Sequence, residues 1–84
     1  MAYKQLTKLI REKTQRKETI ETKVLNLYEA SNPSFYYVYE VLGDYYAAIQ
    51  QIDTAITYWQ KALTMPIPKQ AEKVRIQQKI NKNQ

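Results

Sequence analysis

Apolar residues recur at helical spacing along most of this chain. They fall at positions 6, 9 and 10, and then at 20, 24, 27 and 28, as they would on one face of a helix. The nine residues between these groups, REKTQRKET at 11–19, are all polar but include neither Gly nor Pro. The pattern permits either two helices that meet near 15–18 or one long helix from about 4 to 30. The absence of a turn signal favours the long helix.

A clear turn signal follows in SNPS at 31–34. Pro33 disfavours helical geometry at Asn32 and suits the first turn of a new helix, which Asn32 or Ser34 can cap. We therefore expect a second helix from about 35 to 49. Its apolar residues occupy every face, so it should be covered on two or more sides.

Two further helices are predicted after it. The first runs from about 53 to 65 with Asp53 as a candidate N-cap, and MPIP at 65–68 ends it. The second runs from about 68 to 82 and is mostly polar. Their apolar positions are Ala55, Ile56, Trp59, Ala62 and Leu63 in the first and Ala71, Val74, Ile76 and Ile80 in the second.

Small residues lie where the helices at 35–49 and 53–65 should cross. Helices joined by a tight turn pack antiparallel, and close approach needs small side chains with large ones beside them. Gly43, Ala55 and Ala62 are the small residues. We expect Trp59 to fill the groove between the helices as part of the core.

These residues resemble the tetratricopeptide repeat over about 36–69. The pattern of that family, read here, is Tyr39, Leu42–Gly43, Tyr46, Ala55, Trp59, Ala62 and a Pro at 66 or 68. Gln50–Gln51 replaces the usual Gly-Asp at the turn, where left-handed geometry would strain a Gln by about 1 kcal/mol.

The resemblance implies a single small all-α domain over 1–84. It would be an antiparallel helix-turn-helix array with one repeat unit at 33–67. An N-terminal helix or degenerate repeat at 1–32 would precede this unit, and a capping helix and tail at 68–84 would follow it.

The same resemblance implies protein–protein interaction or assembly rather than catalysis. The first helix of each repeat lines the concave face, which here would place partner-binding residues at Tyr37, Glu40, Asp44, Ala47 and Ala48. Glu40 and Asp44 share one helix face and predict an acidic, aromatic groove for a basic or amphipathic peptide. The alternative is a solvated face. Two carboxylates would repel the acidic tails that some family members bind.

A second resemblance is to the helical tail of some bacterial acyltransferases and hydrolases of the penicillin acyltransferase-like group. The matching residues after the repeat are Thr64, Ile67, Glu72, Ile76 and Ile80. The N-terminal Cys nucleophile of that family has no counterpart here. This chain would then be a non-catalytic fragment of a larger bacterial enzyme.

The composition narrows the chemistry further. With no Cys and no His, the chain has no thiol nucleophile or disulfide and lacks the commonest general base and metal ligand. It shows no Gly-rich phosphate loop and no metal-ligand cluster, so we expect neither catalysis nor a cofactor. No apolar run approaches the length of a membrane span. A complete chain without a signal peptide would be cytoplasmic.

Charge is unevenly distributed along the chain. Residues 1–23 and 66–84 are each basic by +4, whereas the Tyr-rich middle, 24–65, is acidic by −3. The basic first segment could contact nucleic acid or an anionic surface, but the separation of Tyr from Lys and Arg argues against nucleic acid. One repeat cannot bury its own faces. The N-terminal segment or a second copy must cover the helix at 35–49, and we expect a homodimer in isolation.

Overall fold

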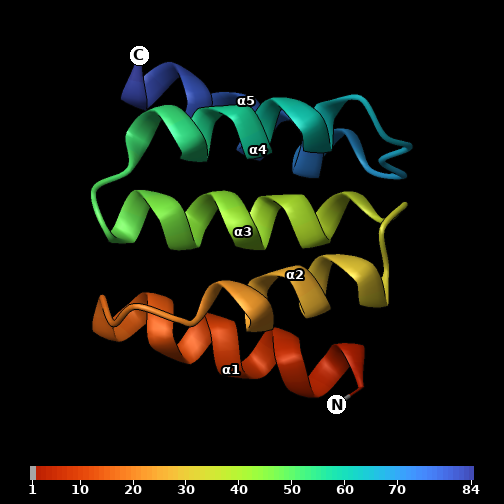
Figure 1. Ribbon diagram of the computed structural model, residues 1–84. Coiled ribbons are helices and arrows are strands. Elements are labelled where there is room, and N and C mark those ends of the chain that lie inside the picture. Colours follow the sequence, from red (N-terminus) through yellow and green to blue (C-terminus); the bar gives the residue numbers. More distant parts are fainter. Residues whose placement is uncertain (1) are drawn as a thin grey trace.

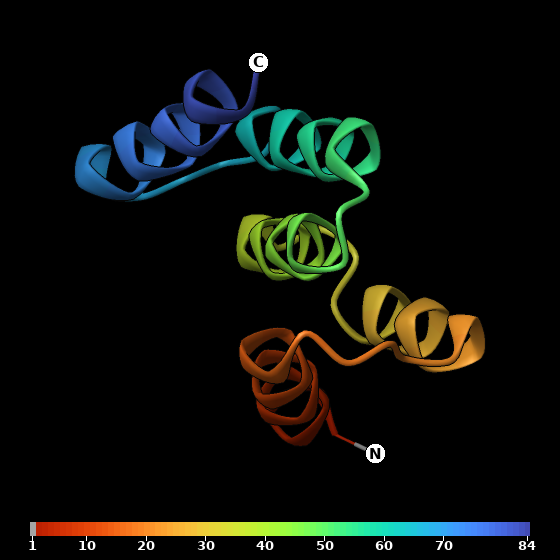
Figure 2. The same cartoon turned by 90° about the vertical axis from the view of Figure 1, so that its left-hand side faces the viewer.

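The computed structural model describes residues 2–84, and within them it contains helices and no strand. The predicted all-α class is confirmed. Successive helices reverse direction (Figure 1). Seen nearly end-on, α1 lies below α3 and α4 above it, with α2 at the lower right and α5 at the upper left (Figure 2). The helices are α1 (Tyr3–Arg16), α2 (Thr22–Ser31), α3 (Tyr36–Ala48), α4 (Ile52–Leu63) and α5 (Gln70–Asn83).

The N-terminal region forms two helices, so the preference for one long helix over 4–30 was wrong. Lys17 adopts left-handed geometry with a φ of 57°, and the amide of Glu18 donates to the carbonyl of Lys13 at 3.0 Å. This is a helix C-terminal cap formed without Gly. The chain then turns back, and the amide of Ile20 donates to the hydroxyl of Tyr45 on α3 at 2.8 Å. A tertiary contact therefore fixes a turn that has no local signal.

The α1–α2 hairpin covers one side of α3. Leu6 and Ile10 of α1 and Leu25 and Tyr28 of α2 are all buried. Most of α3 is buried as well, as its apolar faces predicted. The need for cover that suggested a second copy is thus met within one chain.

The packing of α3 against α4 follows the predicted small residues. Ala55 and Ala62 are fully buried and Trp59 is only 2% exposed, so its predicted place in the core is confirmed. A Cβ added to Gly43 would lie 2.4 Å from Cδ1 and Nε1 of Trp59. The indole thus occupies the space that the missing side chain leaves. Its Nε1 donates to Oδ1 of Asp44 at 3.1 Å.

The predicted N-caps were wrong in detail. Phe35, rather than Asn32 or Ser34, is the N-cap of α3, and Gln51, rather than Asp53, is the N-cap of α4. Neither cap residue makes a side-chain capping bond. The turn between these helices closes through backbone bonds, including one from the amide of Gln51 to the carbonyl of Tyr46 at 2.9 Å.

Two non-glycine residues within 2–84 adopt left-handed geometry, and we expect glycine to stabilise the fold at both. Gln50 has a φ of 68°, as the sequence suggested for this turn, and Lys17 has one of 57°. Relief of the Cβ penalty should exceed the added entropy of the unfolded chain, for a gain of about 0.5–1 kcal/mol at each site. Urea unfolding of Gln50→Gly and Lys17→Gly, followed by Trp59 fluorescence, measures this. A loss of stability in either variant would contradict it.

The C-terminal helix α5 packs against α4. Ile76 and Ile80 are buried, whereas Val74, another apolar position, is 42% exposed. An irregular connector over 64–69, with Pro66 and Pro68, joins the two helices. Among residues 2–84, no helix combines the length and apolarity that a membrane crossing needs.

Candidate interaction groove

An open hollow of about 380 Å³ lies over α3 between α1 and α5. A second hollow of about 170 Å³ shares Arg11 and Asp44 with it, so the two form one groove along α3, here called the α1/α5 groove. The lining of the larger hollow is Arg11 from α1, Tyr37, Glu40 and Asp44 from α3, and Glu72, Arg75 and Lys79 from α5.

Three of the five predicted partner-binding residues line this groove. They are Tyr37, Glu40 and Asp44. Ala47 and Ala48 are half-buried and lie outside the lining of both hollows. The structure thus brings together the aromatic and acidic residues of the prediction.

The cations of the groove were not predicted. Arg75 and Lys79 are four residues apart on α5, as Glu40 and Asp44 are on α3. This matched spacing was the available signal, because two facing helices can pair charges at equal intervals. Arg11 gave no comparable signal, since only the fold brings α1 beside α3.

Arg75 and Lys79 bind the two carboxylates closely. Arg75 makes a two-pronged contact with Glu40, from Nε to Oε2 at 2.8 Å and from Nη2 to Oε1 at 2.7 Å. Lys79 donates to Glu40 at 2.8 Å and to Asp44 at 3.0 Å. Glu40 is only 1% exposed. Arg75 and Lys79 of α5 therefore neutralise Glu40 and Asp44, the two carboxylates on which the expected acidic groove depended.

The two carboxylates differ in their proton affinity. Burial alone would raise the pKa of Glu40, but hydrogen bonds from Arg75 and Lys79 outweigh it and hold the pKa below its usual value. Burial raises the pKa of Asp44, and the charge of Glu40 adds to this effect. Lys79 offsets only part of it. Glu40 is thus the firmly ionised member of the pair.

The lowered pKa of Glu40 predicts that the stability of the fold decreases in acid. Because its folded pKa lies below the unfolded value of 4.5, its stabilisation is complete above that pH and is lost as pH falls through the folded pKa. Asp44 acts in the opposite sense, since its raised pKa favours the folded state once it is protonated. Glu40→Gln should be less stable than the parent at about pH 7 and nearly equal to it at about pH 2. Urea unfolding across this range measures the gap, and a gap independent of pH would contradict the prediction.

Beside its charged centre the groove has an aromatic end. Tyr37 lies 6.4 Å from Phe35 between ring centroids, and Phe35 lies 6.1 Å from Tyr3 of α1. Phe35 is 37% exposed. A partner can therefore reach apolar aromatic surface next to the paired charges.

Glu40 is the least accessible charged side chain of the groove. Both of its carboxylate oxygens accept hydrogen bonds from Arg75 or Lys79. No group of three or more acidic side chains within residues 2–84 could hold a metal ion. Arg11 lines the groove and makes no ion pair with any residue in that range. Comparisons with protein families, curated proteins and solved structures found no match for this chain.

Proposed function

We propose that this chain is a non-catalytic interaction module that binds a segment of another protein in the α1/α5 groove. The observation that carries the proposal is the groove itself. Side chains of α1 and α5 line its two sides, and side chains of α3 line its base. Exposed aromatic surface lies at one end, and charged side chains lie at its centre. Partner binding on this face is also what the resemblance to the tetratricopeptide repeat implies.

The charges of the groove favour an amphipathic segment over a strongly basic one. Three cations, Arg11, Arg75 and Lys79, balance the three carboxylates in the lining. Glu40 and Asp44 already have cationic partners, so they attract a basic peptide less than two free carboxylates would. An apolar side chain would rest on Phe35 and Tyr37, with polar groups toward Arg11.

The homodimer stays a prediction. The reason first given for it, the need to cover α3, no longer applies because the α1–α2 hairpin covers that helix. Only Leu27, Phe35 and Val74 are exposed among the large apolar side chains of residues 2–84. The proposed binding unit is accordingly one chain. Sedimentation at tens of micromolar distinguishes a species of 10.0 kDa from one of twice that mass.

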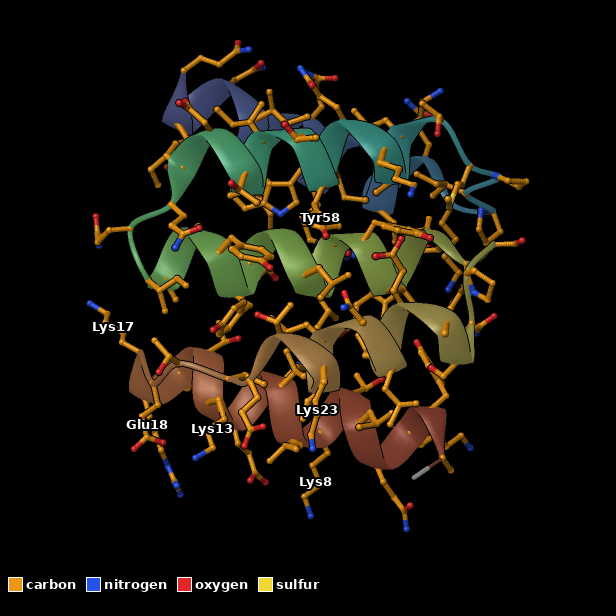
Figure 3. All side chains as sticks on the ribbon, viewed as in Figure 1. Lys8, Lys13, Lys17, Glu18, Lys23 and Tyr58 are labelled. Carbon is orange, nitrogen blue, oxygen red and sulfur yellow. The ribbon has the colours of Figure 1, made fainter. Side chains whose placement is uncertain are left out.

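Selection of peptides from a random display library against the full chain tests the groove. An enriched peptide should bind at least about tenfold more weakly to Arg11→Ala and Tyr37→Ala, as expected when contacts central to an interface are removed. Tyr58→Ala is the matched control, because Tyr58 is also half-buried but lies between α3 and α4 (Figure 3) and outside the lining of both hollows. Circular dichroism checks that each variant is folded.

A selection that yields no binder would contradict the proposal. Equal losses in Tyr37→Ala and Tyr58→Ala would contradict it as well, because the effect would then not be specific to the groove.

A further inference from the structure

The side of the molecule formed by the α1–α2 hairpin is strongly basic. Residues 3–31, which form this hairpin, contain seven Lys and Arg against four Glu. The one ion pair between two residues of that segment is Lys13–Glu18, at 3.4 Å, and Glu29 pairs with Lys61 of α4. Figure 3 shows the side chains of Lys8, Lys13 and Lys23 directed toward the lower edge, whereas Lys17 lies higher at the left and points away from them. Lys8, Lys13 and Lys23 are called the basic face.

The fold turns these lysines outward. Leu6 and Ile10 of α1 are fully buried toward α3, which directs the exposed side chain of Lys8 away from the core. On α2, Lys23 and Leu27 are one turn apart and share a face. Leu27 is 52% exposed, the highest value among the large apolar side chains described. The basic face therefore includes one protruding leucine beside its lysines.

We propose that the basic face binds an anionic lipid surface. Lysines near a membrane interact with negative headgroups while their stems remain in the apolar boundary. Leu27 gains from burial only if the partner offers an apolar medium, which the acyl boundary does. This surface is separate from the α1/α5 groove, and its role does not depend on peptide binding there.

Two features favour lipid over nucleic acid. Glu12, Glu18 and Glu21 are interspersed among the lysines. Anionic lipids diffuse and can gather around fixed cations, whereas the phosphates of a nucleic acid are held at covalent spacing. In addition, residues 8–23 contain no aromatic side chain on which a base could stack.

Co-sedimentation of the full chain with vesicles tests the proposal. The probes are phosphatidylcholine vesicles with about one third phosphatidylserine, compared with pure phosphatidylcholine, at about 0.1 M salt. The chain should sediment only with the anionic vesicles. Lys8→Gln/Lys23→Gln should lower the partition coefficient about 25-fold, on the basis of about fivefold for each lysine. Leu27→Ser should lower it severalfold without changing its salt dependence.

Lys73→Gln/Lys82→Gln on α5 is the matched control, because it removes the same net charge from exposed residues of another helix. An equal loss in this control would overturn the proposal, since net charge alone would then explain binding. Failure of the parent chain to sediment with anionic vesicles would overturn it too. So would tighter binding to a single-stranded RNA oligonucleotide with the same dependence on Lys8 and Lys23, which would indicate a nucleic-acid site.

Discussion

Replacement of Gly43 by Ala is expected to lower the free energy of unfolding by about 2–3 kcal/mol. A Cβ at this position would lie 2.4 Å from two atoms of the Trp59 indole, which is rigid and itself buried. Neither helix backbone can yield without disturbing the interface between α3 and α4. In a solvated helix the same change would stabilise by about 1 kcal/mol. A loss of stability in Gly43→Ala, rather than a gain, would therefore indicate the close contact between Gly43 and Trp59.

A double-mutant cycle isolates this contact. Trp59→Leu alone should be strongly destabilising, because it removes a large buried ring. In the Gly43→Ala background it should cost at least about 1 kcal/mol less, since the two side chains no longer compete for one space. Urea unfolding monitored by circular dichroism serves all four proteins, because Trp59 fluorescence is lost in two of them. Additive effects would contradict the predicted contact.

Removal of Arg75 and Lys79, the two cations that pair with Glu40, should also lower the free energy of unfolding strongly. Arg75→Ala/Lys79→Ala leaves a carboxylate that is 1% exposed in the parent without a partner. Breaking a buried pair in this way costs about 3 kcal/mol. Loss of the cations should also loosen α5, since Ile76 and Ile80 are its only buried residues.

Two further variants separate charge from general damage to α5. Lys73→Ala/Lys82→Ala removes two exposed lysines of the same helix and should cost less than about 0.5 kcal/mol. Adding Glu40→Gln to the Arg75→Ala/Lys79→Ala protein should recover part of the loss, because a neutral amide is less costly to bury than a lone carboxylate. No recovery would show that packing of the cation stems, rather than charge, holds α5 in place.

The ion pairs of Arg75 and Lys79 with Glu40 and Asp44 also link the stability of the fold to the proposed peptide binding. Arg75 and Lys79 are at once the contacts that hold α5 against α3 and part of the groove lining. A variant that releases α5 should therefore lose the wall of the groove together with its charge balance. We expect the Arg75→Ala/Lys79→Ala protein to bind a selected peptide more weakly than its loss of charge alone would predict.

The groove could be predicted from the sequence in part. Tyr37, Glu40 and Asp44 were placed on one face of a helix by their spacing, and that face does line the groove. Spacing could not reveal that α5 would cover Glu40, because the effect depends on how a distant helix packs. The acidic character expected of the groove was accordingly wrong, and the role of these residues in partner binding stays a prediction.

The sequence by itself determined the helical class, the packing of α3 against α4 and the burial of Trp59. These features depend on local helix propensity and on the size of residues at regular intervals. Both can be read directly from the order of the amino acids. The tertiary structure alone decided the break after Arg16, the hydrogen bond from Ile20 to Tyr45, and the neutralisation of Glu40 by α5. The break after Arg16 closes through local backbone bonds at Lys17 and Glu18, but no Gly or Pro announces it. The other two features join segments far apart in sequence, and their energy comes from contacts that exist only after the helices have assembled.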